Sequence, residues 1–315
     1  MLRKLEMSKN LIRTDAANIN LILFCCLALM WSGSFINIKL VVMAMPPIFC
    51  AVMRVLVSLV CLAIFFTAAN KRFLRYTTGC WRIWVAGAFT QAIPFGLLFY
   101  GEKFVAPALA SIVNSTVSIW ALILGACLFK DMASWTPLRV GGLILGFAGI
   151  VIIFAPSLNH GQSSAIGVIA ITGMAISYAF GSLLSQHIIF GKMQVTFETN
   201  LFHQHVASVL MLMLASLLFE TWPTINQVTE PRMLFAFLYL GLIATAIAWI
   251  IYFYLIREWG AVRATSVTYV VPVLAIIWDL LFLHLVPTVS ELMGAAAILI
   301  SVVLIQWTRK MVIKE

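Results

Sequence analysis

The sequence predicts an all-α integral membrane protein with ten transmembrane helices in two inverted five-helix repeats. Hydrophobic residues make up 63% of the 315 residues and charged residues 10%, and the mean hydropathy is +1.05. Such a chain has too little polar surface to cover a soluble domain. Apolar runs of about 20 residues, enough for a helix to cross a hydrocarbon core roughly 30 Å thick, recur from Ile19 almost to the C-terminus. Two similar stretches, one in each half, indicate the repeat.

Each predicted span is an apolar run between short polar or turn-rich breaks, because a helix satisfies its own backbone hydrogen bonds in lipid. In order, the spans cover residues 19–42, 47–68, 83–101, 107–129, 137–155, 166–189, 199–219, 233–256, 264–285 and 290–307. Pro94 and Pro272 lie inside spans and predict broken or adjusted helices there. No break is long enough for an extramembrane domain, so catalysis on a soluble module is not expected.

The basic residues predict the orientation of the chain. The net charge is +9, yet the distribution of these residues argues against a nucleic-acid partner. If the N-terminus is cytoplasmic, nearly all Lys and Arg residues outside the spans lie on the cytoplasmic side. Only Lys103 and Arg232 fall on the opposite side of the membrane. This positive-inside bias predicts a multi-pass protein of the cytoplasmic (inner) membrane with both termini in the cytoplasm. The first apolar segment is too long for a cleaved signal peptide.

The two similar stretches are EKFVAPALASIVNSTVSIWAL, from Glu102, and EWGAVRATSVTYVVPVLAIIW, from Glu258. Each begins in a polar turn and continues into a span. Because five is odd, a second five-helix copy must enter the membrane from the opposite side. Repeats related in this way share a pseudo-two-fold axis in the membrane plane, which is the geometry of alternating access.

The residues also resemble a known family. The segments WSGSFINIKL, NSTVSIWALILGACLFKD, GGLILGFAGIVII and IATAIAWIIYFYLIREWGAVRATSVTYVVPVLAI, together with Arg54, are similar to the EamA family of the drug/metabolite transporter superfamily. The resemblance implies ten helices, inverted repeats, and export or exchange of amino acids, other metabolites or drugs. It divides the chain into a cytoplasmic N-terminal segment (1–18), a first EamA repeat (19–155), a periplasmic linker (156–165), a second EamA repeat (166–307) and a cytoplasmic tail (308–315).

Polar and aromatic side chains inside the spans are the candidate binding residues, since polar groups are costly in hydrocarbon and are commonly functional. They are Trp31, Ser34, Asn37, Gln91, Asn114, Ser118, Tyr178, Ser182, Thr245, Trp249, Tyr252 and Tyr269. Arg54 and Asp279 lie at similar depth. We predict that this pair acts in gating or coupling or binds a carboxylate. The alternatives are a structural ion pair and two side chains that reach separately toward the membrane interface.

The predicted function is secondary transport of a small amphipathic solute, such as an amino acid, by an exporter or exchanger in the lipid bilayer. A multidrug efflux carrier and a channel are alternatives. The proton is a candidate coupling ion, with Asp279, His203, His205 and Glu102 as titratable groups, and a gradient of the solute alone is the other driving force. We expect no cofactor, no metal and no enzymatic activity, because nucleotide-binding and HExxH motifs do not occur in the sequence. The oligomeric state is left open.

Overall fold

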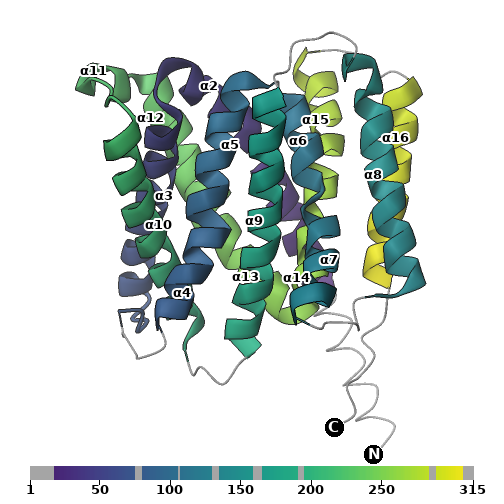
Figure 1. The fold of residues 1–315 in the computed structure, drawn as a ribbon, viewed down its shortest axis with the longest axis horizontal. Helices are drawn as coiled ribbons and strands as arrows, with labels where there is room; N and C mark the ends of the chain where they lie inside the picture. The colour runs from purple at the N-terminus through teal and green to yellow at the C-terminus, as the bar shows by residue number, and fades with distance from the viewer. Residues whose placement is uncertain are drawn as a thin grey trace, which may run out of the picture.

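The computed structural model describes residues 18–74, 80–105, 107–129, 135–158, 165–190, 195–283 and 289–307, and all regular elements in these ranges are helices (Figure 1). Residues 18–32 are helical and lead into the first labelled element. Up to residue 158 the elements are α2 (Ser34–Ala44), α3 (Pro47–Ala68), α4 (Cys80–Gly87), the π-helix η1 (Ala88–Ala92), α5 (Ile93–Phe104), α6 (Pro107–Ser115), α7 (Val117–Phe129) and α8 (Pro137–Leu158).

The second half continues the helical pattern. Its elements are α9 (Ala165–Phe190), α10 (Phe197–Phe219), α11 (Ile225–Val228), α12 (Pro231–Leu238), the π-helix η3 (Tyr239–Ile247), α13 (Ala248–Trp259), α14 (Ala261–Thr265), α15 (Val267–Leu283) and α16 (Val289–Trp307). The prediction of an all-α protein is therefore confirmed for the residues described.

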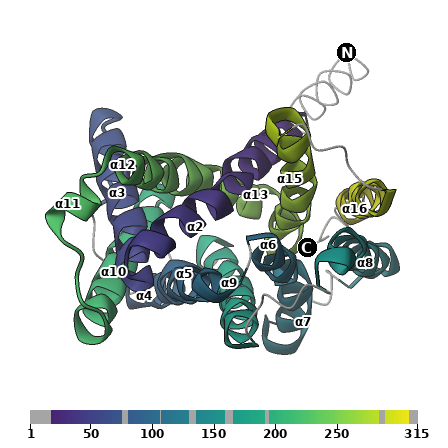
Figure 2. The ribbon, with the colours of Figure 1, turned by 90° about the horizontal axis from the view of Figure 1, so that it is seen from above.

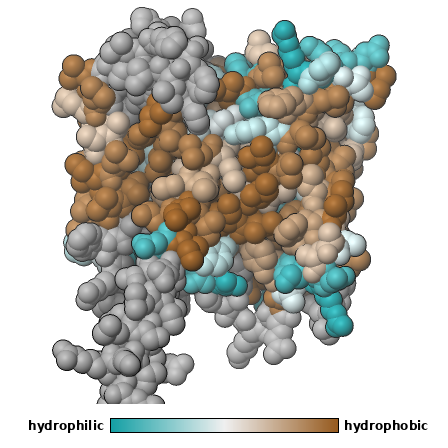
Figure 3. All heavy atoms as spheres, turned by 180° about the vertical axis from the view of Figure 1, so that it is seen from behind, coloured by the Kyte–Doolittle hydropathy of each residue, from teal (hydrophilic) through white to brown (hydrophobic). Residues whose placement is uncertain are grey.

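Six helical stretches in the described part of the chain are long and apolar enough to cross a membrane: Asn18–Ala44, Pro47–Ala68, Cys80–Phe104, Ala165–Ile188, Phe197–Phe219 and Pro231–Trp259. Shorter apolar helices accompany them. In the view from behind, apolar side chains cover the middle of the coloured surface, and polar ones gather above and below it (Figure 3). An apolar band of this kind matches a hydrocarbon environment. Most of the predicted N-terminal segment and linker, and all of the tail, lie outside the described residues.

Two of the membrane-length stretches change from α-helix to π-helix and back. In the stretch Cys80–Phe104, η1 ends at Ala92, two residues before Pro94, which has no N–H to donate to the preceding turn. In the stretch Pro231–Trp259, η3 extends over nine residues. Departures of this kind are frequent at functional sites, because they free backbone carbonyls and re-aim side chains.

Pro272 has a different effect from the predicted break. It lies inside the continuous helix α15, and the interruption comes earlier, at Ser266 between α14 and α15. Without an N–H on Pro272, the carbonyl of Thr268 loses its helical donor. The Ser115 hydroxyl on α6 donates to this carbonyl over 3.0 Å. The proline thus creates a contact between α15 and α6.

The first stretch is interrupted at Gly33, where the backbone makes a turn between residue 32 and α2. A Cβ atom on Gly33 would lie 2.3 Å from the Tyr239 hydroxyl oxygen. That hydroxyl donates to the carbonyl of Met30 over 3.0 Å. Glycine therefore lets Tyr239 of η3 reach the helical backbone before α2, and it joins the two halves of the chain.

The helices α8 and α16 lie side by side at one end of the molecule in both ribbon views (Figures 1 and 2). Gly149 of α8 faces the carbonyl of Gly294 on α16, and an added Cβ would lie 2.7 Å from that oxygen. Gly142 and Gly146 face the same helix. These small residues allow the backbones of the two helices to pack closely.

Candidate functional site

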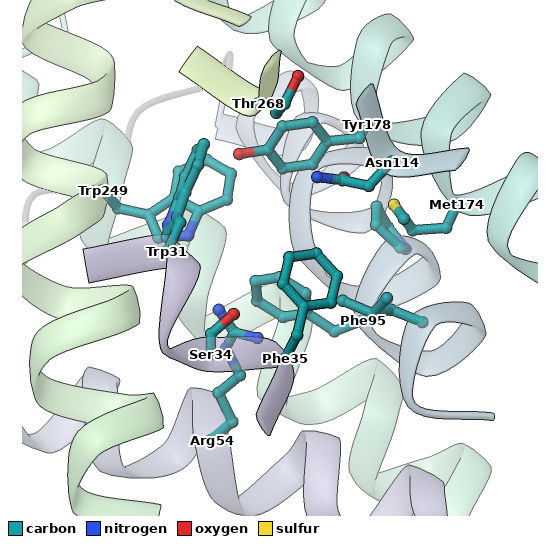
Figure 4. Close-up of a pocket in the computed structure, with 12 residues that line it drawn as sticks. Trp31, Ser34, Phe35, Arg54, Phe95, Asn114, Met174, Tyr178, Trp249 and Thr268 are labelled. Carbon is teal, nitrogen blue, oxygen red and sulfur yellow. The ribbon is translucent and has the colours of Figure 1, made fainter. Parts of the chain in front are cut away.

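The central cavity is lined by side chains from both halves of the chain. Its walls are Trp31, Ser34, Phe35, Arg54, Pro94, Phe95, Leu98, Asn114, Met174, Tyr178, Trp249 and Thr268. Figure 4 shows Trp31, Tyr178 and Trp249 on one side of this space, with Arg54 and Ser34 at the other end. The cavity volume is about 40 Å³, which accommodates a few water molecules. A larger solute requires the walls to move apart.

Three aromatic rings, those of Trp31, Tyr178 and Trp249, line the cavity, and a fourth, Tyr252, packs against them. Tyr252 lies behind the cavity lining, with its ring centroid 5.3 Å from Trp31, 5.8 Å from Tyr178 and 5.5 Å from Trp249. These separations fall in the range of favourable ring contacts. The Ser182 and Tyr252 hydroxyls share a hydrogen bond of 2.8 Å. The two residues therefore position the rings that face the cavity.

Arg54 is the charged group in the cavity wall, and its side chain is 3% exposed. Its Nε donates to Thr245 Oγ1 over 2.8 Å, and its Nη2 donates to the carbonyl of Ala244 over 3.2 Å. The guanidinium carbon lies 4.2 Å from the centroid of the Phe95 ring, close enough for a cation–π contact. In the described part of the structure, Nη1 has no hydrogen-bond partner.

The π-helix η3 supplies the acceptors that hold this end of the cavity. The Ala244 carbonyl accepts from both Arg54 and Trp31 Nε1, the latter over 3.1 Å. Thr245 accepts from Arg54 and donates its own hydroxyl to the carbonyl of Leu240 over 2.6 Å. One irregular helical segment thus orients a cation from α3 and an aromatic ring from the first stretch.

Of the twelve predicted binding residues, the structure brings five into the cavity wall: Trp31, Ser34, Asn114, Tyr178 and Trp249. Thr245 and Tyr252 contact residues of that wall as described above, and the Ser182 hydroxyl donates to the carbonyl of Tyr178 over 2.7 Å. The side chain of Asp279 lies outside the described part of the structure, so its pairing with Arg54 stays a prediction.

Four predicted binding residues have other neighbours. The Asn37 side-chain amide donates to the carbonyl of Gly33. The Gln91 amide nitrogen, Nε2, lies 3.2 Å from Nδ1 of His205. Ser118 donates to Thr265 Oγ1 over 3.2 Å. The Tyr269 hydroxyl donates to the carbonyl of Leu143 on α8 over 3.3 Å. These side chains are not part of the cavity lining, and their predicted role in binding stays a prediction.

Several lining residues were not among the predictions, including Phe35, Phe95, Met174 and Thr268. Met174 precedes Tyr178 by one helical turn, so the spacing that groups residues on one helix face was a usable signal. Phe35 and Phe95 gave no such signal, because phenylalanine in an apolar span is as expected against lipid as against a cavity.

Comparison with known proteins fits this arrangement. The sequence model of the EamA-like transporter family matches residues 18–155 and again residues 165–307. The chain belongs to the EamA-like transporter family. The resemblance seen in the sequence is thereby confirmed. Membership in a transporter family, with apolar helices of membrane length, makes this chain a multi-pass membrane protein that acts on a small-molecule substrate.

Relatives of this EamA-like transporter share a quarter of its sequence over most of its length. An uncharacterized transporter of Bacillus subtilis (strain 168), YvbV, is 26% identical and covers 92% of each chain. A probable amino-acid metabolite efflux pump of Salmonella typhimurium is 26% identical over 85% of this chain and 88% of its own. A solved crystal structure at 18% identity matches with a TM-score of 0.73 over 91% of this chain and 96% of the other, and it supports the fold alone.

Proposed function

We propose that this EamA-like transporter moves amino acids or related amphipathic metabolites across the cytoplasmic membrane as an exporter or exchanger. The observation that carries the proposal is Nη1 of Arg54, a buried donor without a hydrogen-bond partner among the described residues, at a cavity lined by aromatic rings. A guanidinium binds a carboxylate through paired hydrogen bonds. The rings of Trp31, Tyr178 and Trp249 offer an apolar surface for the remainder of the solute.

The pathway we propose is alternating access between two inverted five-helix repeats of a ten-helix bundle. The family match supports this arrangement because it occurs twice, once in each half. The small cavity supports it too, since its walls must move apart to admit a solute of amino-acid size. The distribution of basic residues favours the inner membrane with both termini in the cytoplasm. Two relatives, each named as a probable amino-acid metabolite efflux pump, favour the substrate class.

Counterflow in liposomes tests the function. Purified protein is reconstituted into vesicles that are loaded with unlabelled L-phenylalanine and L-leucine, and the entry of each labelled amino acid is followed. A carrier accumulates the labelled amino acid inside the vesicles, because it exchanges external label for internal unlabelled solute faster than the solute gradient is lost. We expect accumulation in the wild type, loss of accumulation in Trp249→Ala, and wild-type behaviour in Trp81→Ala, whose ring is exposed.

If neither amino acid shows counterflow, although the reconstituted protein has the same melting temperature as before reconstitution, the amino-acid proposal is rejected. Uptake of an apolar cationic dye by the same vesicles would then favour the multidrug alternative. Flux that does not saturate and shows no counterflow would favour a channel.

A further inference from the structure

A groove lies between α5 and α10, away from the central cavity. The stretch Cys80–Phe104 packs against α10 through α4 and η1, whereas α5 packs chiefly on α9, α3 and α2. Figure 1 shows α4 beside α10 and α5 farther from it. The change comes at η1 and Pro94, where the helix departs from regular α geometry and can bend. Beyond this point α5 and α10 diverge, and the groove between them has a volume of about 380 Å³.

The lining of the groove is apolar. Ala88, Ala92 and Gly96 recur every four residues, so they share one face of η1 and α5 and leave room there. The opposite side comes from α10, with Leu212, Ala215 and Phe219. Both helices belong to stretches that are long and apolar enough to cross a membrane. The groove therefore borders the hydrocarbon, and it is far too small for a neighbouring helix, which is about 10 Å across. A lipid chain fits this space.

The length of the groove corresponds to one leaflet of a bilayer. On η1 and α5 its lining extends from Ala88 to Tyr100, which is about 18 Å along a helix at 1.5 Å per residue. Half of the hydrocarbon core measures about 15 Å. Tyr100 is partly exposed, and tyrosine is common at the boundary between membrane and water. An acyl chain that enters beside Tyr100 therefore reaches the middle of the membrane within the groove.

At the Tyr100 end the groove continues into a second hollow, which has a volume of about 590 Å³. Ile48, Tyr100 and Phe219 line both spaces, so the two are continuous. The second hollow is lined by one basic and one acidic side chain, Lys103 near the end of α5 and Glu220 directly after α10. Lys103 is exposed and lies one helical turn beyond Tyr100, where its ammonium group can bind a lipid phosphate.

Glu220 is held at the start of α3. Its Oε1 accepts from the N–H of Ile48 over 2.7 Å, and its Oε2 accepts from the N–H of Phe49 over 2.7 Å and from the Ser216 hydroxyl over 3.0 Å. A carboxylate has about four acceptor positions, so Oε1 retains one for a further donor. An ammonium group supplies such a donor, whereas a trimethylammonium group has no N–H to donate.

We propose that this groove is a binding site for phosphatidylethanolamine. One acyl chain lies between α5 and α10, the phosphate binds Lys103, and the ammonium group of the same headgroup donates to Glu220. Phosphatidylglycerol offers the phosphate without a cation for Glu220, and phosphatidylcholine carries a cation without an N–H donor. The lipid fills the space behind α5, whose Phe95 and Leu98 line the central cavity. It thereby supports that wall of the cavity from the outside.

Native mass spectrometry measures lipid binding without any transport. The full chain, freed of lipid in detergent, is titrated separately with phosphatidylethanolamine, phosphatidylglycerol and phosphatidylcholine that have identical acyl chains, and the Kd of the first bound lipid is determined for each. We expect phosphatidylethanolamine to bind roughly three- to fivefold more tightly than either of the others, as one additional partly exposed charge pair would provide. Equal or tighter binding of phosphatidylglycerol or phosphatidylcholine would overturn the proposal.

Variants with unchanged melting temperatures place the lipid in the groove. Gly96→Leu fills the groove, while its Cβ makes only an ordinary contact of 3.5 Å with Leu212, and we expect roughly tenfold weaker binding of phosphatidylethanolamine. Its control is Gly141→Leu on α8, where nothing lies within 4 Å of an added Cβ. Lys103→Gln should weaken binding roughly three- to fivefold, and Arg232→Gln, at an exposed position, should leave it unchanged. Wild-type affinity in both Gly96→Leu and Lys103→Gln would place the lipid elsewhere and overturn the proposal.

Discussion

Arg54 shows how a guanidinium is held inside an apolar helical bundle. Two of its nitrogens donate to Thr245 and Ala244 of η3, and its flat face lies over the Phe95 ring. An arginine satisfies these contacts at once because its donors lie in one plane with fixed directions. The third nitrogen, Nη1, is buried and has no hydrogen-bond partner among the described residues, which makes this cavity-lining residue suited to binding an anion.

At this scale we predict that Arg54→Lys impairs transport although it keeps the positive charge. An ammonium group cannot donate to Thr245 and Ala244 and also present a donor to a carboxylate in the same geometry. The loss of a charged hydrogen bond, about 1.5–3 kcal/mol, corresponds to at least a tenfold lower counterflow rate at low substrate. Arg232→Lys, an exposed substitution, is the control. Equal counterflow rates in Arg54→Lys and Arg232→Lys would contradict a direct role for the planar guanidinium donors of Arg54.

At the scale of the element, sequence reasoning predicted where helices occur but not where they change form. Hydropathy reports the cost of placing side chains in lipid, and the apolar runs therefore located the helices. The π-helices η1 and η3 and the turn at Gly33 depend on contacts made by distant segments. Tyr239 against Gly33 joins residues far apart in the chain. Only Pro94, beside η1, marked such a position in advance.

Helix packing provides a second prediction at this scale. Gly149→Ala places a Cβ 2.7 Å from the backbone oxygen of Gly294, so α8 and α16 must separate. Overpacking of this kind costs about 1–3 kcal/mol. Gly141 lies on the same helix with nothing within 4 Å of an added Cβ, and Gly141→Ala should be neutral or stabilising. Melting temperatures in detergent compare the two; an unchanged value for Gly149→Ala would show that the contact is unimportant for stability.

At the scale of the whole molecule, the site combines side chains from both halves. Sequence reasoning identified polar and aromatic residues inside the apolar runs, and Trp31, Tyr178 and Trp249 indeed line one cavity. It could not separate them from Tyr269, which contacts α8 instead. A span that is apolar on all sides carries no periodic signal for its inward face. Three-dimensional packing supplies that information.

The proposed ten-helix arrangement makes a prediction about topology. Five crossings in the first half place the segment after residue 158 on the side of the membrane opposite to the N-terminus, and five more return the C-terminus to the cytoplasm. Alkaline phosphatase folds only in the periplasm, so a fusion after residue 158 should be active and one after residue 307 inactive. Green fluorescent protein at the same positions should give the reverse pattern. An even number of crossings in the first half would leave the phosphatase inactive after residue 158, and the second half would then run parallel to the first, which excludes inverted repeats.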